Sequence, residues 1–343
     1  MNRNVFAMDF GCLPRELAPM AILSDLTACI WSEELCGLLR LCGEKEASIG
    51  VDASQYDRFL AFCRCVPLLQ GHRLVTEITE MIRSFFGIGM PVTEENGPAI
   101  WHQAAVRLNE DNVTPAMLCR FFLPVDVTPR LLCDVDGAAE AKLAGLEPVC
   151  NGNRLLSTDA RDWNAWKREL KDTCQRFAEC GCQTAFVTVG DRFCDPVPSV
   201  YHVDQCLCQG KEKEEDRRIK LAQVLRFLAE ECVSRNWTLI LRIHCPSREI
   251  LSLLNRLERT VGLPNIIWSC ADLLIAEALL RFSVQPHRNP VQWAISLSDF
   301  PSNEELAAGL SAYAARYPMG KLLALSHADL RFLPLKEQRL ILQ

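Results

Sequence analysis

Apolar residues between Arg217 and Asp329 recur in blocks that alternate between two periodicities. The segment RRIKLAQVLRFLAEECVSR carries its apolar residues at intervals of three and four, the pattern of one buried helix face. Asn236 ends this pattern, and Trp237–Cys245 is predicted to be a buried strand. The same succession of helix and strand recurs with strands at Asn265–Cys270, Val291–Ser298 and Lys321–His327. Such alternation predicts a parallel sheet with helical crossovers.

The first half of the chain follows a different pattern. Val5–Phe10 is a short apolar segment that we expect to be the first strand, whereas residues 16–110 are helical and irregular, with no strand candidate. Three further strands are predicted at Pro129–Asp134, Leu146–Cys150 and Thr184–Val189. Eight strands favour a (β/α)8 TIM-type barrel, an α/β fold, formed by the whole chain (residues 1–343) as one domain. Residues 16–110 would be a helical insertion after strand 1, and an open doubly wound sheet is the alternative.

Composition limits the classes of function. The net charge of −6 and the pI near 5.6 indicate no basic surface, so nucleic acid is not an expected partner. The chain has no apolar run of about eighteen residues and no signal-peptide core near Met1, so we expect a cytoplasmic protein that does not enter the membrane. It has no glycine-rich phosphate loop, nucleophile elbow or HExxH sequence. Nothing in the sequence specifies an oligomeric state.

The chain contains 18 cysteines, which is many for its length. Since no export signal is seen, we expect reduced thiols that pack as small apolar side chains. Three Cys-x-Cys pairs raise the possibility of zinc, but structural zinc sites usually separate paired ligands by two or more residues. We therefore prefer packing over zinc binding for these pairs, which are Cys63/Cys65, Cys180/Cys182 and Cys206/Cys208.

Phrases spread over nearly the whole chain resemble the uronate isomerase (glucuronate isomerase) family, a metal-dependent branch of the amidohydrolase barrels. The phrase VFAMDFGCLPRELA resembles the family's first strand, SFFGI its RPFGI, and AIWHQAAVRL its IW helix. The segments CQRFAECGCQTAF, FLAEECVSRNWTLILRIHC, LPNIIWSC and LSHADLRFL resemble the regions of strands 4, 5, 6 and 8. The order and spacing of these phrases carry the resemblance.

The resemblance implies aldose–ketose isomerisation of D-glucuronate and D-galacturonate at a divalent metal, zinc or manganese. In the family a His-x-His pair on strand 1 and an Asp on strand 8 hold the metal, assisted by a His on strand 5 and an Arg after strand 3. The metal would polarise the sugar oxygens. A base would move a proton between adjacent carbons, and a cation would hold the uronate carboxylate.

This chain departs from that pattern at nearly every position. The two strand-1 histidines correspond to Asp9 and Gly11, and the strand-5 histidine corresponds to Arg242. The strand-8 aspartate corresponds to Ala328, or to His327 if one residue is inserted. Since all of these ligands change together, the sequence predicts that the metal has been lost. Asp9 and His327 are the candidate ligands if a rearranged metal site exists.

The region after strand 3 also differs. The family's arginine there corresponds to Asn151, with Arg154 at the position of a neighbouring lysine, whereas Asp136 retains a family carboxylate. We therefore consider Arg154 a candidate substrate-binding residue and Asp136 a candidate catalytic residue.

Alternate residues of the predicted fifth strand face opposite sides of the sheet. One face is wholly apolar, which suits packing against helices: Leu239, Leu241, Ile243 and Cys245. The other face is therefore predicted to point into the barrel, and it consists of Thr238, Ile240, Arg242 and His244.

Arg242 would then be a permanent cation close to the mouth of the barrel. One hypothesis is that Arg242 replaces the charge of the metal and pairs with Asp9 or Asp136. The simpler alternative is a salt-bridged core arginine that binds no ligand.

Four further candidates lie at the ends of predicted strands, on the side where barrel active sites lie: His244, Ser298, Asp299 and His327. They complete the two sets of candidate residues. The candidate catalytic residues are Asp136, Arg242, His244 and His327. The candidate substrate-binding residues are Arg154, Arg242, Ser298 and Asp299.

Two functional interpretations follow. The first is a degenerate uronate isomerase homologue, without metal or isomerase activity, that binds a sugar acid or a protein partner. The alternative is an active isomerase with a rearranged metal site, for which catalytic zinc would usually need a third protein ligand.

Overall fold

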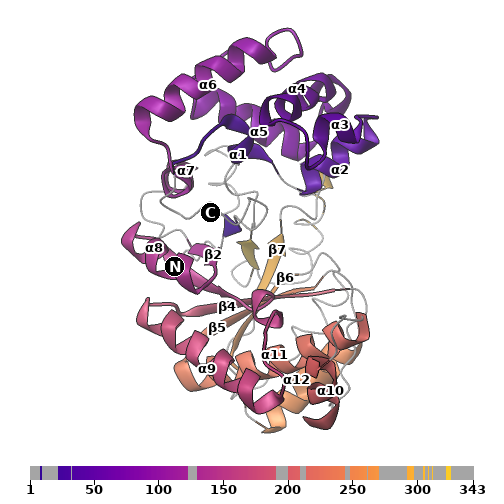
Figure 1. Ribbon diagram of the computed structural model, residues 1–343, viewed down its shortest axis with the longest axis vertical. Helices are drawn as coiled ribbons and strands as arrows, with labels where there is room; N and C mark the ends of the chain where they lie inside the picture. Colours follow the sequence, from indigo (N-terminus) through magenta and orange to yellow (C-terminus); the bar gives the residue numbers. More distant parts are fainter. Residues whose placement is uncertain are drawn as a thin grey trace.

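Eight parallel strands form one sheet in the order β1 to β8, so every strand pairs with its neighbours in the chain (Figure 1). The computed structural model describes residues 8–9, 22–31, 33–122, 130–190, 200–208, 214–243, 248–260, 262–269, 292–296, 304–305, 308, 311 and 322–325. The strands are β1 (Met8–Asp9), β2 (Arg130–Cys133), β3 (Glu147–Asn151), β4 (Thr184–Val189), β5 (Thr238–Ile243), β6 (Asn265–Ser269), β7 (Gln292–Ser296) and β8 (Leu322–Leu325). This sequential order is that of a (β/α)8 barrel and confirms the predicted fold. A doubly wound sheet would reverse its strand order part-way, so that alternative is wrong.

Helices follow the strands and cover the outer side of the sheet. They are α8 (Val135–Leu143), α9 (Trp163–Glu179), α10 (Val200–Cys208), α11 (Glu214–Arg235) and α12 (Arg248–Thr260), with a short 3-10 helix, η2 (Arg154–Leu156), after β3. Asn236 has a φ of 56°, the left-handed conformation that asparagine adopts more readily than most residues. It turns the chain from α11 into β5, as the sequence pattern predicts.

The segment between β1 and β2 is helical and encloses a core of its own. Its helices are α1 (Leu26–Ile30), α2 (Glu33–Leu41), α3 (Glu46–Ile49), α4 (Gln55–Cys65), η1 (Val66–Leu69), α5 (Arg73–Ser84), α6 (Gly97–Asp111) and α7 (Pro115–Phe122). Figure 1 shows them together at one end of the molecule, away from α9 to α12. Phe59, Phe62 and Ile78 are fully buried in this core. The helical insertion predicted after strand 1 is therefore present, and its last helix ends at Phe122, beyond the predicted limit at residue 110.

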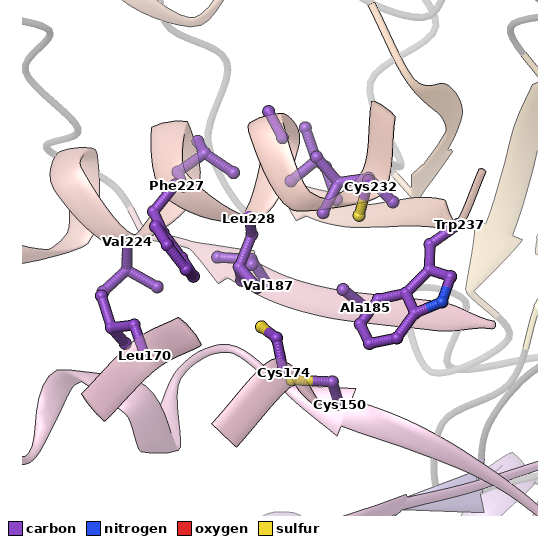
Figure 2. Packing of buried hydrophobic residues seen from close by; sticks show 14 of the residues in the cluster. Cys150, Leu170, Cys174, Ala185, Val187, Val224, Phe227, Leu228, Cys232 and Trp237 are labelled. Atoms are coloured by element: carbon purple, nitrogen blue, oxygen red, sulfur yellow. The ribbon is translucent and has the colours of Figure 1, made fainter. Parts of the chain in front are cut away.

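Two apolar layers lie on opposite sides of the barrel sheet. The inner layer takes one residue from each of five neighbouring strands: Leu132, Val149, Phe186, Ile240 and Ile267. The outer layer packs the sheet against α9 and α11. Figure 2 shows side chains of these helices gathered around two residues of β4, Ala185 and Val187.

The predicted orientation of β5 is confirmed. Ile240 belongs to the inner layer, whereas Leu239, Leu241 and Ile243 belong to the outer layer. Because side chains alternate along a strand, Arg242 lies on the same face as Ile240, toward the carboxyl end.

Candidate functional site

The inner face of the barrel changes from apolar to polar toward the carboxyl ends of the strands. Phe186, Ile240 and Ile267 are in register on β4, β5 and β6. Two residues further along, Thr188, Arg242 and Ser269 are in register on the same strands. Since positions two apart share a face, Thr188 and Arg242 belong to the next layer toward the mouth. Arg242, partly exposed, is the cationic member of this layer.

The turn after β3 continues this polar layer. Asn153 Oδ1 accepts a hydrogen bond from the backbone N–H of Thr188 (3.2 Å), and Asn151 Oδ1 accepts one from the backbone N–H of Asn153 (3.1 Å). Gly152 donates its N–H to Phe186 O at 2.8 Å. The loop is therefore attached to β4 at two successive residues, Gly152 and Asn153, and it holds the Asn153 amide against the strand that neighbours Arg242.

Gly152 is required at this close approach. A Cβ atom there would lie 2.6 Å from Val187 Cγ2 and 2.7 Å from Leu228 Cδ1, closer than carbon atoms approach without bonding. Any larger residue would push the turn away from β4 and α11. The absence of a side chain thus positions the segment that carries Arg154.

Arg154 points toward the helical side of the sheet and pairs there with Asp134. Its Nη1 donates to Asp134 Oδ2 at 2.9 Å, while Asp134 Oδ1 accepts the backbone N–H of Gly137 and caps α8. Both side chains are substantially exposed. The pair therefore joins the turn after β3 to the start of α8. This contact engages one nitrogen, Nη1, of the Arg154 guanidinium.

Asp136 lies in the first turn of α8, on the surface. Its carboxylate accepts a hydrogen bond from Arg176 Nη2 of α9 at 3.1 Å, and its side chain is 92% exposed. The part of the hypothesis that paired Arg242 with Asp136 is therefore wrong, because α8 directs Asp136 outward to Arg176 while Arg242 faces inward. The other proposed partner, Asp9, ends β1, and the structure describes its backbone only.

Two residues predicted from the sequence, Asp136 and Arg154, line the same cavity, which has a volume of about 280 Å³. Both ion pairs line it, above a floor of Trp166, Leu170 and Phe177. These three residues belong to the outer apolar layer, so the cavity lies between α8 and α9 on the helical side of the sheet. It is separate from the inner face that carries Arg242.

Cys133 also lines this cavity, and it is unsuited to nucleophilic or metal chemistry. Burial raises the pKa of the Cys133 thiol far above its ordinary value, and its Sγ donates weakly to Val149 O at 3.9 Å. A neutral thiol is a poor nucleophile and a poor metal ligand.

Four of the candidate residues, His244, Ser298, Asp299 and His327, lie outside the described residues. Conversely, the structure adds residues that the sequence analysis missed: Asp134, Asn153, Arg176 and Thr188. Asp134 carried a usable signal, since an aspartate directly before a helix is a common N-cap. Arg176 carried none, because it meets Asp136 only through the packing of α9 on α8.

The described residues do not fit the metal that the family resemblance implies. Within these parts of the chain, no three His, Cys, Asp or Glu side chains are arranged to hold a metal ion. Arg242 stands where the resemblance places the strand-5 histidine. A guanidinium has no lone pair to donate, and its permanent charge repels a divalent cation. We therefore derive no chemical step through a metal.

Comparison with known proteins gives a consistent result. A family model described as glucuronate isomerase matches residues 30–136. Uronate isomerase of Oceanobacillus iheyensis is 22% identical over 309 residues, which cover 74% of this chain and 62% of that protein. Uronate isomerase of Caldicellulosiruptor bescii is also 22% identical over 309 residues, covering 80% of this chain and 65% of that protein. The chain thus spans less than two thirds of the length of these two curated relatives.

Solved structures agree in fold. The crystal structure of uronate isomerase from Thermotoga maritima matches with a TM-score of 0.68 at 16% identity, over 98% of this chain and 90% of that one. Glucuronate isomerase from Caulobacter crescentus matches with a TM-score of 0.67 at 13% identity, over 94% of this chain and 83% of that one. None of the described helices has the length and apolarity that crossing a membrane requires.

Proposed function

Because this chain belongs to the uronate isomerase family, we propose that it is a divergent member that binds a sugar acid at the barrel mouth and has lost the metal-dependent isomerisation. The observation that carries this proposal is the position of Arg242. It lies on the inner face of β5, in register with Thr188 and Ser269, one layer beyond the apolar filling of the barrel. This is the end of the barrel where ligands of such folds bind.

Arginine suits binding better than catalysis. A guanidinium presents several N–H donors in a planar fork that matches a carboxylate, and these charge-assisted hydrogen bonds are strong. It remains protonated at all physiological pH values, so it cannot act as the base that moves a proton between sugar carbons. Thr188 supplies a hydroxyl on the adjacent strand, and Asn153 supplies an amide on the other side of that strand; both groups hydrogen-bond to sugar hydroxyls. The layer therefore supports recognition of a carboxylate-bearing polyol.

The test is binding of D-glucuronate, measured by calorimetry and by the melting temperature. D-glucose is the matched ligand, since it has the ring and hydroxyls but no carboxylate. We expect glucuronate to raise the melting temperature and glucose to leave it unchanged. Equal effects of the two sugars, or no effect of glucuronate, would reject a carboxylate site.

Variants locate the site. Arg242→Gln should weaken glucuronate binding at least about tenfold, because it removes a charge-assisted hydrogen bond. Arg242→Lys, which keeps the charge without the fork, should have an intermediate effect. Arg176→Ala is the control, since it removes an exposed arginine on the helical side of the sheet. If Arg176→Ala weakens binding as much as the Arg242 variants, the ligand binds elsewhere.

Loss of isomerisation is tested separately, on protein purified without chelators. We expect neither stoichiometric zinc nor manganese by elemental analysis and no conversion of D-glucuronate to its ketose. Near-stoichiometric metal together with turnover would establish the alternative, an active isomerase with a rearranged metal site. Binding and turnover are independent measurements, so either half of the proposal can fail alone.

A further inference from the structure

A turn in the helical insertion is held firmly against the last turn of α4. After α2, the N–H groups of Cys42 and Glu44 donate to Leu38 O and Leu39 O, both at 3.0 Å. Gly43 between them has a φ of 92°, which glycine adopts without strain. Arg64 of α4 then donates Nε and Nη2 to the two oxygens of Glu44 at 2.8 and 2.7 Å. This two-point ion pair fixes the turn relative to α4.

This arrangement brings two thiols together. Cys65 is the final residue of α4, and its Sγ donates to Glu44 Oε1 at 3.9 Å. Cys42 precedes Glu44 by two residues in this turn, and its side chain interacts with that of Cys65. Burial raises the pKa of Cys65 to about 12. Cys65 is 2% exposed, whereas Cys42 is only partly buried. Cys42 is therefore the more exposed residue of the two.

We propose that Cys42 and Cys65 are a site of reversible oxidation, and that they form a disulfide when the protein meets a hydroperoxide. The thiolate of Cys42 attacks the peroxide, the O–O bond breaks, and Cys42 becomes a sulfenic acid while water or an alcohol leaves. Cys65 sulfur then attacks the sulfenic sulfur, forming the S–S bond and releasing hydroxide. That hydroxide takes the Cys65 proton and becomes water. With hydrogen peroxide, two thiols and one oxidant give one disulfide and two water molecules.

The surroundings support the second step. Glu44 accepts the hydrogen bond of the Cys65 thiol, which holds this thiol at the turn that carries Cys42. The product would join the ends of α2 and α4 and enclose both α3 and α4 in a covalent loop. Closing a loop restricts the unfolded chain and so favours the folded state.

A second pair of neighbouring thiols in the barrel provides an internal control. Cys150 of β3 and Cys174 of α9 also interact, but both side chains are fully buried in the outer apolar layer (Figure 2). An oxidant cannot reach them without unfolding. Cys208 is the opposite case, an exposed thiol whose Sγ donates to Arg161 O at 3.2 Å. Unlike Cys150 and Cys174, the Cys42/Cys65 pair includes one residue, Cys42, that is partly exposed.

The experiment treats the folded, full-length protein with a small excess of hydrogen peroxide. Remaining thiols are then alkylated and the protein is digested for mass spectrometry. We expect a linked peptide pair containing Cys42 and Cys65, lighter than the sum of the two reduced peptides by two hydrogens and removed by dithiothreitol. The melting temperature should rise by several degrees on oxidation and return on reduction.

Variants make the result decisive. Cys42→Ser should abolish the linked pair and the rise in melting temperature, and its partly exposed position should preserve folding. Cys208→Ser and Cys150→Ser should retain both. If Cys42 is recovered as sulfinic acid without a link, or linked to a different cysteine, the assignment is overturned. A Cys150–Cys174 link formed as fast as the Cys42–Cys65 link would also overturn it, because accessibility would then not select the pair.

Discussion

The barrel and the helical insertion each enclose an apolar core, but the ion pairs at the outer cavity of the barrel differ from the Arg64–Glu44 pair of the insertion. In the barrel, the Arg154–Asp134 and Arg176–Asp136 pairs lie at the surface, with side chains between 40% and 92% exposed. In the insertion, Arg64 and Glu44 are only 33% and 13% exposed and are joined by two hydrogen bonds. Partly buried, two-point pairs fix structure, whereas exposed single-point pairs contribute little. The difference indicates that the two pairs at the outer cavity of the barrel contribute little to stability, whereas the Arg64–Glu44 pair helps to fix the insertion.

The largest expected effect tests the apolar layer of the barrel. Leu241→Ala removes a side chain that is 1% exposed in the outer layer, and we expect a loss of about 2–5 kcal/mol in the free energy of unfolding because a cavity remains. Chemical denaturation measures this loss. Leu143→Ala, at a leucine that is 84% exposed, should change stability by less than about 0.5 kcal/mol. Equal losses in the two variants would contradict the assignment of the layer.

A substitution in the turn after β3 should have the next largest effect. Gly152→Ala places a methyl group against Val187 and Leu228, so we expect a loss of about 1–3 kcal/mol from overpacking. The melting temperature is the measurement. At Gly190, where an added Cβ meets no atom within 4 Å, the same substitution should be neutral. A neutral Gly152→Ala variant would show that the turn can move away from β4.

The ion pair of the insertion should make stability depend on pH. The hydrogen bonds from Arg64 hold the pKa of Glu44 below its ordinary value. A lowered carboxyl pKa stabilises the fold above the unfolded-state pKa, and this stabilisation is lost as pH falls through the folded-state pKa. Glu44→Gln should therefore reduce the free energy of unfolding by about 1 kcal/mol at neutral pH, with the difference shrinking below about pH 4.

Glu46 provides the matched control for this pH dependence. It pairs with Arg40, but both side chains are more than half exposed. Denaturation curves of Glu44→Gln and Glu46→Gln over a range of pH should show the larger difference for Glu44. A constant difference across the range would mean that Glu44 acts through packing rather than charge.

The smallest effect is expected in the exposed pair of the barrel. Asp136→Asn removes one charge from a side chain that is 92% exposed, and we expect a change of less than about 0.5 kcal/mol. Added salt should leave the difference from the unsubstituted protein close to zero. A loss above about 1 kcal/mol would place Asp136 among groups that hold α8 and α9 together. The contrast drawn between the two regions would then disappear.

The spacing of apolar residues along the chain was sufficient to predict the architecture, because this spacing directly reflects which side chains are buried. The alternation in β5 predicted which side chains enter the barrel, and Ile240 and Leu241 lie on opposite sides of the sheet as expected. The helix-to-strand turn at Asn236 was also predictable, because a single asparagine interrupts two regular patterns. These features depend on neighbours a few residues apart, which is the range that sequence periodicity covers.

The candidate site could be predicted only in part. The inward position of Arg242 followed from strand alternation. The direction of Asp136 did not, because an aspartate in the first turn of a helix can face any neighbour that packs beside it. Family resemblance suggested a role for Asp136 near Arg242, whereas α8 carries it to Arg176 on the helical side of the sheet. Resemblance of short phrases locates a residue in the chain but does not orient its side chain.

The sequence by itself determined the succession of strands and helices, the helical insertion and the inner face of β5. Only the tertiary structure decided which charged and sulfur-bearing side chains meet: Arg154 with Asp134, Arg176 with Asp136, and Cys42 with Cys65. The physical reason is that burial of apolar surface imposes a regular spacing on the chain, which can be recognised locally. Polar contacts between distant segments impose no such spacing, since they arise from how whole helices pack.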